Sequence, residues 1–239
     1  MNTLICGRYQ DIPDMRKCRS SNRFPKAMDK AETSSDTDLT DYAALMGQLH
    51  LQAGIPYTPN WSAAADFLQI IVDYCLETKP ATVFECSSGL TTLMLARCCQ
   101  LSGRGRVISL EDGEDFAGKI REHLKGYGLI SYASVIHTPL RQTLLDEVEY
   151  AWYDTRTIPD TRIEMLVIDG PSGFLQKNSR YPALPLLYTR LADGCRVFLD
   201  DAARPDEREI VELWLNRFPS IEVERVTASR GCAMLTIRK

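Results

Sequence analysis

The chain has 239 residues, of which 44% are apolar and 25% charged, and its formal net charge is −4. This balance is ordinary for a globular protein and excludes a general attraction to nucleic acid or to anionic membranes. No apolar run approaches the ~20 residues that span a bilayer, and the N-terminal sequence lacks the apolar core of a secretion signal. A cytoplasmic location is therefore expected. The eight cysteines form no CxxC pair, which predicts free thiols rather than a zinc site or a disulfide framework.

Three segments follow one another along the chain. Residues 1–38 are polar and of mixed charge, which predicts a flexible N-terminal segment. Residues 39–80 contain helical patterns beginning near Thr40 and over 62–77, and they predict N-terminal helices that are a candidate lid. Residues 81–239 alternate between apolar runs and helical patterns, and form the domain expected to bind a ligand.

The apolar runs of this domain are short, as in strands that are buried on both faces. They are, in chain order, 82–86, 106–110, 133–137, 164–169 and 195–200, and each is interpreted as the strand of a βα-type unit. Helical patterns lie at about 90–101, after 113, over 182–192 and after 204, whereas the polar stretch 141–162 gives no clear signal. The last two runs, 221–226 and 232–237, are separated only by a turn and predict a hairpin. The fold class predicted is α/β: a doubly wound, Rossmann-like, seven-stranded sheet, mostly parallel with a C-terminal antiparallel hairpin.

Acidic residues lie at the carboxyl ends of four of the five predicted parallel strands. They are Glu85, Glu111 with Asp112, Asp169, and Asp200 with Asp201. In an open α/β sheet, ligands bind beyond the carboxyl ends of the strands. Carboxylates gathered there raise one another's pKa, which is costly without a partner. The pattern therefore favours a binding site for hydroxyls, amines or a cation over a set of unrelated helix caps.

The first of these strand ends, in "TVFECSSGLTT" at 82–92, indicates which ligand is bound. A turn of small residues lets a ligand approach the backbone, and an acid at the end of the second strand can accept both hydroxyls of a ribose. Glu111 lies 22 residues after Gly89, near the ~20 expected for such a pair. The turn has one glycine and no GxGxxG, and the chain has no phosphate-binding loop with a Lys-Ser/Thr pair. A nucleoside without phosphate, such as S-adenosylmethionine, fits this turn better than a dinucleotide.

Four segments carry a resemblance to a known family: "VFECSSGLTTLMLAR", "VISLEDGEDFA", "IEMLVIDGPSG" and "VFLDDAAR". They look like the successive strand-end motifs of class I S-adenosylmethionine-dependent methyltransferases, and the C-terminal hairpin resembles the reversed last strand of that family. A bacterial group of methyltransferase-like proteins is similar through "WYD" at 152–154, "IDGP" and "RYPAL" at 180–184. The resemblance covers residues 60–239. One departure is that the family usually has a glycine where Cys86 or Ser87 stands, so the larger side chains are expected to narrow the cofactor pocket.

The resemblance implies a set of cofactor-binding residues: Glu85, Cys86, Ser87, Ser88, Gly89, Glu111, Asp112, Thr138, Leu140 and Asp169. Glu85 and the backbone of the first turn would hold the methionine end of the cofactor. Glu111 would bind the ribose, with Asp112 beside the adenine and residues 138–140 along the adenine ring. Asp169 would face the sulfonium and the methyl acceptor.

The aspartates that end the fourth and fifth strands are also candidate metal ligands. Asp169, Asp200 and Asp201 offer the oxygen atoms that Mg²⁺ or Ca²⁺ prefers. They look like the metal triad of catechol-type O-methyltransferases, although the third ligand there is usually Asn. The alternative is structural: Asp201 pairs with Arg204 or caps the following helix.

Two further groups of side chains are weighed as functional residues. Arg180, Tyr181 and Arg204 are candidate substrate-binding residues, and the arginines could equally pair with nearby aspartates. His137 could act as a base, but its position on the adenine side favours a structural role.

The sequence therefore predicts a methyltransferase that uses S-adenosylmethionine and a small-molecule acceptor, with O-methylation favoured over N-methylation. Asp169 and Asp201 are the candidate catalytic groups if a base or a metal such as Mg²⁺ is required. Two alternatives stay open: an NAD-type oxidoreductase, which the absence of GxGxxG disfavours, and a non-catalytic protein that retains the fold.

Overall fold

The structure is a computed structural model that describes residues 41–51 and 55–239. The predicted flexible segment 1–38 lies outside the described residues. No helix in these described ranges is both long and apolar enough to cross a membrane. The six cysteines they contain are buried free thiols.

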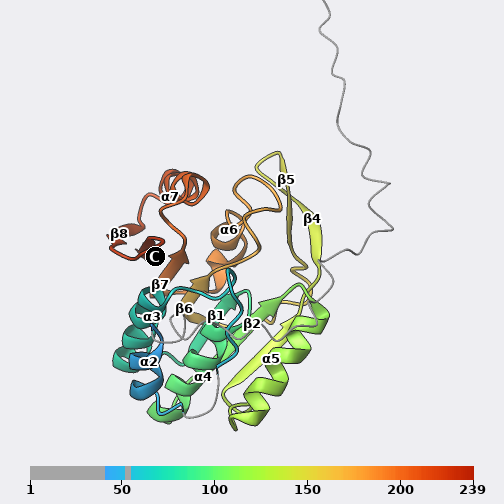
Figure 1. The fold of residues 1–239 in the computed structure, drawn as a ribbon. Helices are drawn as coiled ribbons and strands as arrows, with labels where there is room; N and C mark the ends of the chain where they lie inside the picture. Colours follow the sequence, from blue (N-terminus) through green and yellow to red (C-terminus); the bar gives the residue numbers. More distant parts are fainter. Residues whose placement is uncertain (1–40, 52–54) are drawn as a thin grey trace, which may run out of the picture. The chain divides into compact units, whose positions relative to one another are not determined.

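Seven strands form one sheet in the order β3-β2-β1-β6-β7-β9-β8, which confirms the predicted fold class (Figure 1). Their bounds are β1 Thr82–Cys86, β2 Arg106–Glu111, β3 Ala133–His137, β6 Ile163–Ile168, β7 Leu191–Asp200, β8 Glu222–Val226 and β9 Cys232–Thr236. Strands β3, β2, β1, β6 and β7 are parallel, and β9 is antiparallel to both β7 and β8. The chain builds outward from β1 through β2 to β3 and then returns to β6 on the other side of β1. The carboxyl ends of β1 and β6 are therefore the switch point at which ligands bind in such sheets.

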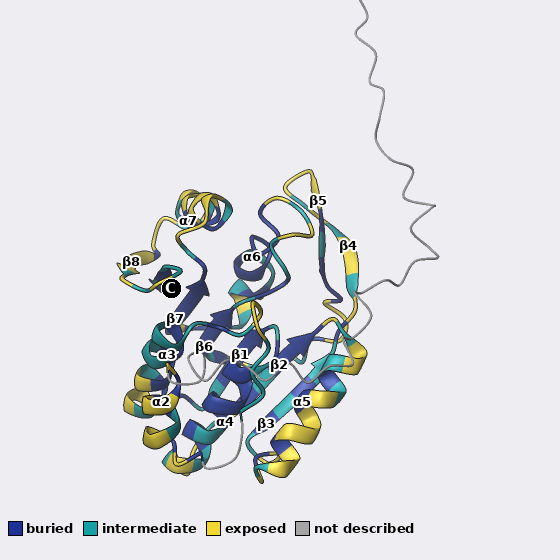
Figure 2. Cartoon of the chain, in the orientation of Figure 1, coloured by how far each residue is buried: buried dark blue, intermediate teal, exposed yellow. Residues whose placement is uncertain are grey.

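Helices cover both faces of the sheet, and each face has its own apolar core (Figure 2). The helices are α2 Ala43–Gln48, α3 Ala65–Thr78, α4 Leu90–Ser102 and α5 Glu114–Gly126, then α6 Ala183–Leu187 and α7 Pro205–Arg217. The first four bury residues such as Phe67 and Leu93 in one core, whereas α6 and α7 bury Leu184 and Trp214 in the other. Side chains alternate between the faces of a strand, so α6 and α7 contact a different set of sheet residues from α3 and α4.

The polar stretch 141–162, for which no element was predicted, contains most of a separate two-stranded hairpin. Its strands are β4 Leu140–Leu145 and β5 Val148–Tyr153. Its turn is Asp146-Glu147, and both residues have positive φ, 52° and 65°. Such a two-residue turn usually contains a glycine, and because this one has none, no hairpin was predicted here. The prediction of five strand-helix units is thus wrong at β3, which is followed by this hairpin and not by a helix.

Some predicted boundaries are also wrong. The helix predicted over 182–192 ends at Leu187, is followed by a 3₁₀ turn over Tyr188–Arg190, and gives way to β7 at Leu191. The first N-terminal helix is shorter than its pattern suggested. The second begins at Ala65, three residues later than its pattern suggested, and Ser62 accepts a hydrogen bond from the Thr58 N–H within the preceding turn.

Candidate active site

The turn after β1 has the tight backbone that its small residues predicted. Ser87 has a φ of 95°, a region that favours glycine, and its N–H donates to the Leu110 carbonyl at 3.0 Å. Gly89, with a φ of 156°, is the N-cap of α4. Ser87 is a position where the resembling family often has glycine, and it keeps a glycine-type backbone despite its side chain.

The first turn and the acid at the end of β2, which the sequence paired as parts of one ligand site, are in direct contact. Glu111 Oε2 accepts hydrogen bonds from the Ser88 N–H at 3.1 Å and from the Ser88 hydroxyl at 2.7 Å. Glu111 Oε1 accepts from the Gly113 N–H at 3.1 Å. Burial raises the pKa of Glu111, and the hydrogen bonds from Ser88 oppose that effect. The carboxylate is held in a fixed orientation at the edge of the predicted nucleoside site.

The side chain of Glu85 lies in the protein interior rather than on the accessible side of the turn after β1. Its side chain is 1% exposed, Oε2 accepts a short hydrogen bond from the Ser109 hydroxyl of β2, and Oε1 has no hydrogen-bond partner. Burial, opposed by the hydrogen bonds of Ser109 and Thr92, raises the pKa of Glu85 to about 7. The structure places this carboxylate below the turn, beside the first helical turn of α4.

The residues predicted to flank adenine gather near Glu111. The Thr138 N–H donates to the Glu111 carbonyl at 2.7 Å, and its side chain is fully buried against Ile136. Leu140 begins β4, and Asp112 is exposed at the end of β2. The structure thus brings the predicted nucleoside-side residues together at one corner of the sheet.

Tyr153 of β5 extends to the switch point, and its position there makes it a candidate functional residue. It is fully buried, and its hydroxyl has no hydrogen-bond partner. A Cβ atom added to Gly170 would lie 2.7 Å from this hydroxyl and 2.8 Å from Ser87 Cβ. The phenol therefore lies between the first turn and the loop after β6.

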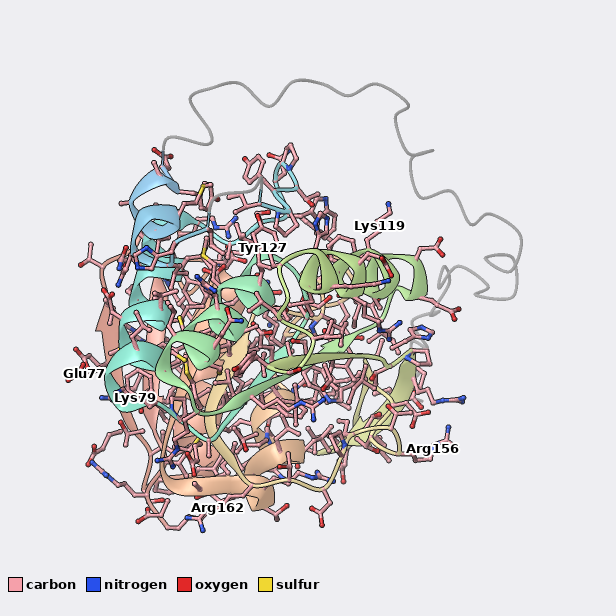
Figure 3. All side chains as sticks on the ribbon, turned by 90° about the horizontal axis from the view of Figure 1, so that it is seen from below. Glu77, Lys79, Lys119, Tyr127, Arg156 and Arg162 are labelled. Atoms are coloured by element: carbon pink, nitrogen blue, oxygen red, sulfur yellow. The ribbon has the colours of Figure 1, made fainter. Side chains whose placement is uncertain are left out.

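The next residue, Asp154, anchors the end of the same hairpin strand. Its carboxylate pairs with Arg141 and with Arg156, both at 2.6 Å, and Arg156 lies at the surface of the molecule (Figure 3). These two arginines lower the pKa of Asp154. This pairing holds the strand that carries Tyr153.

The predicted acids after β6 and β7 form one group, which we call the carboxylate cluster: Asp169, Asp200 and Asp201. One oxygen from each lies within 4.8 Å of the others. Burial, together with the neighbouring aspartates, raises the pKa of Asp169 and of Asp200. The structure thus brings these three side chains together.

Three arginines surround the carboxylate cluster. Arg180 Nη2 lies 3.2 Å from Asp169 Oδ1 and 3.1 Å from Asp201 Oδ2. Arg204 Nη1 lies 2.9 Å from Asp201 Oδ2. Arg230 lies between Asp200 and Asp201, with Nη2 at 3.0 Å from Asp200 Oδ2 and Nε at 3.2 Å from Asp201 Oδ1.

This arrangement decides how well a divalent cation fits. The donors are of the right kind, but each aspartate already has a guanidinium within 3.2 Å. A metal would have to displace these ion pairs, so the residues do not fit it as they stand. The structural alternative weighed for Asp201, pairing with Arg204, is the one observed.

Two positions differ from their predicted roles or were missed. Tyr181 points away from the carboxylate cluster, because its hydroxyl donates to Asp146 Oδ2 of the hairpin turn at 2.9 Å. Arg230 was missed because it lies in the turn of the C-terminal hairpin, and the antiparallel pairing of Cys232 with Asp200 brings it to the cluster. No local sequence signal marks it.

Arg230 also lines an open cavity of about 630 Å³. The cavity is bounded by the start of the described chain, by α3 and by the C-terminal hairpin turn, through residues that include Tyr42, Asn60, Gln69 and Ser229. A ligand in this cavity would lie against the same arginine that contacts the carboxylate cluster.

Residues 86–202 match the model of a family described as a methyltransferase domain. No curated protein sequence is significantly similar to the chain.

Solved structures share the fold at low sequence identity. The O-methyltransferase from Bacillus cereus in complex with SAH has a TM-score of 0.57 and 16% identity, over 87% of this chain and 94% of that one. The O-methyltransferase TomG from Streptomyces achromogenes, involved in tomaymycin synthesis and in complex with SAM, gives 0.57 and 14%, over 85% and 91%. The SAH-bound methyltransferase PaMTH1 from Podospora anserina gives 0.59 and 13%, over 83% and 88%.

The sheet order and the family match define an α/β protein with a methyltransferase domain. Its fold is shared with solved methyltransferases in complex with SAH or SAM, and residues 86–202 are the part of the chain that the family model matches.

Proposed function

We propose that this methyltransferase moves a methyl group to an oxygen atom of a small molecule. The O-methyltransferases among the similar structures support this acceptor class. The observation that carries the proposal is the contact between Ser88 and Glu111, which joins the first turn to the end of β2 at a nucleoside site.

On the cofactor side, the residues bind and orient. S-adenosylmethionine supplies an electrophilic methyl group on its sulfonium when bound. Glu111 is the candidate ribose ligand, because its carboxylate is fixed at the end of β2 by Ser88 and Gly113. The unpaired hydroxyl of Tyr153 fits a polar group of the ligand at the switch point. Glu85 supports the turn from below, so its contribution to the methionine end would come through the backbone it holds.

On the acceptor side, Asp169 is the candidate group to contact the acceptor. Its side chain is 18% exposed, whereas that of Asp201 is 3% exposed and that of Asp200 is fully buried. An accessible carboxylate beside the switch point can accept a hydrogen bond from a hydroxyl and align its oxygen. Alignment and exclusion of water are the main contributions that an in-line methyl transfer needs.

The acceptor would enter through the cavity beside Arg230. The described part of the N-terminal region, which was predicted to form a lid, provides one of its walls. Asp201, which is in contact with three arginines, orients the cluster rather than reacting with the acceptor. The divalent cation expected as an assisting cofactor is not part of this proposal, because guanidinium groups already occupy the aspartates.

Two measurements test the proposal. Calorimetric titration with S-adenosylhomocysteine should give binding in the micromolar range, while titration with NADH should give none. Incubation with S-adenosylmethionine and a panel of phenols, hydroxy acids and amines should then release S-adenosylhomocysteine with a hydroxyl acceptor. Turnover with amines alone would overturn the oxygen assignment, and binding without any turnover would favour the non-catalytic alternative.

A further inference from the structure

The aspartates of the carboxylate cluster are largely removed from water, with side chains that are 18%, 3% and 0% exposed. Its three aspartates adjoin Glu207 of α7, whose side chain is 3% exposed and whose pKa is raised by burial. Like charges that are removed from water repel one another strongly unless cations lie between them. A resident cation is therefore needed, and the structure shows where it is.

Arg180 provides that charge at the centre of the cluster. Its side chain is 4% exposed, and its guanidinium lies between the ends of β6 and β7. Nη2 donates to the carbonyl and carboxylate oxygens of Asp169 at 3.0 and 3.2 Å and to Asp201 at 3.1 Å. Nη1 donates to the Asp200 carbonyl at 3.0 Å and lies 3.7 Å from Glu207 Oε1. One buried side chain thus contacts all four acidic residues.

The other two arginines contribute from outside this centre. The side chain of Arg204 is 43% exposed and that of Arg230 is 32% exposed, against 4% for Arg180. Solvent weakens the pairs of the two outer arginines, so Arg180 contributes the charge that cannot be replaced by water or salt.

A divalent cation would have to compete with this side chain directly. Mg²⁺ requires oxygen ligands in a near-octahedral shell at ~2.1 Å and loses its water reluctantly. A guanidinium is more weakly hydrated, and its planar set of donors matches several oxygens at once. Removing one member of a buried ion-pair group is strongly unfavourable, so the cluster retains Arg180 and excludes the metal.

We propose that the buried guanidinium of Arg180 is the resident cation of the carboxylate cluster, and that this cluster binds no divalent metal in the native protein. Arg180 fixes the Asp169 side chain at the end of β6, which makes it a positioning residue. Only this consequence for catalysis rests on the proposed function. The exclusion of metal does not.

The test measures metal binding independently of activity. Native protein is titrated with Mn²⁺ under electron paramagnetic resonance detection, and its melting temperature is measured with MgCl₂ against NaCl of equal ionic strength. We expect no bound Mn²⁺ at millimolar concentration and no Mg²⁺-specific shift. Binding that the Asp169→Asn variant abolishes would overturn the proposal. Titration with S-adenosylhomocysteine in the same samples reports separately on the proposed function.

The Arg180→Gln variant tests the proposal in the opposite direction, because it should gain the ability to bind a divalent cation. Loss of the central cation should lower the melting temperature by roughly 5–10 °C. It should also create a cation site, so that millimolar Mg²⁺ or Mn²⁺ restores part of the loss. The matched control is Arg204→Gln, which removes an arginine at the exposed side of the cluster. Its melting temperature should fall less than that of Arg180→Gln, and Mg²⁺ or Mn²⁺ should restore less of it.

The variants can also contradict the proposal. A folded Arg180→Gln protein with unchanged stability and no response to cations would show that Arg180 does not hold the cluster. Arg180→Lys keeps the charge but cannot reach four partners, so it should melt between the native protein and Arg180→Gln. If Arg180→Gln does not fold, the Mn²⁺ titration of the native protein and the Arg180→Lys melting temperature still decide the question.

Discussion

Ser88 and Glu111 are 23 positions apart in the sequence and are joined by two hydrogen bonds, at 3.1 Å from the Ser88 N–H and 2.7 Å from its hydroxyl. This contact ties the turn after β1 to the end of β2. A ligand that approaches the turn backbone therefore meets a carboxylate that already has a fixed orientation. Preorganisation of this kind reduces the entropy lost on binding.

Replacing Glu111 should separate cofactor binding from folding. Glu111→Ala removes the candidate ribose ligand, so the dissociation constant for S-adenosylhomocysteine should rise at least ~10-fold, equivalent to about 1.4 kcal/mol. The circular dichroism spectrum should remain native. Glu114→Ala, at an exposed position in the first turn of α5, is the control and should bind normally. Unchanged affinity in Glu111→Ala would rule out the ribose assignment.

The backbone at Ser87 predicts an unusual effect of a glycine substitution. Ser87 has a φ of 95°, which costs a non-glycine residue of order 1–3 kcal/mol. Ser87→Gly relieves this strain, while the greater freedom of the unfolded chain costs roughly 1 kcal/mol. We expect an equal or higher melting temperature and no loss of affinity for S-adenosylhomocysteine. Ser88→Gly, which removes the hydroxyl bonded to Glu111, should melt lower than the native protein, and the reverse order of the two variants would contradict this account.

Glu85 makes stability depend on pH in a specific window. Its pKa is raised from an ordinary 4.5 to about 7, because burial disfavours the charged form. Between these values the folded protein holds a proton that the unfolded chain has lost, so stability falls as the pH rises through 7. The full effect is about 3 kcal/mol. Urea unfolding at pH 5 and pH 8 should show this decline in the native protein and a smaller one in Glu85→Gln. Parallel declines in both proteins would assign the dependence to other groups.

The hydroxyl of Tyr153 should affect stability and binding in opposite directions. It is buried without a partner, and an unsatisfied buried polar group costs about 1–3 kcal/mol. Tyr153→Phe should therefore raise the melting temperature of the ligand-free protein. The same variant should weaken S-adenosylhomocysteine binding, because the hydroxyl lies at the switch point beside Gly170. Unchanged affinity with raised stability would leave Tyr153 a packing residue only.

The sequence by itself determined the sheet and the positions at which ligand-binding groups emerge. Strands such as 82–86 and 106–111 are short, mostly apolar runs with an acid at or next to the carboxyl end, and this pattern has few solutions other than a parallel sheet covered on both faces. The spacing between Gly89 and Glu111 predicted a paired motif, and Ser88 of that turn bonds to Glu111. These features are local or periodic, so they can be read along the chain.

Tertiary structure alone decided which groups neutralise one another. Arg230 lies 29 or more positions after the aspartates it contacts, and only the antiparallel pairing of β7 with β9 brings it to them. The turn at Asp146-Glu147 contains no glycine, the residue that usually identifies such a turn in a sequence. The hairpin that carries Tyr153 to the switch point was therefore not predicted. The three aspartates suggested a metal site because their oxygens suit a cation. The cation that lies between these buried carboxylates is the guanidinium of Arg180. Its identity depends on contacts across the fold, which sequence spacing does not define.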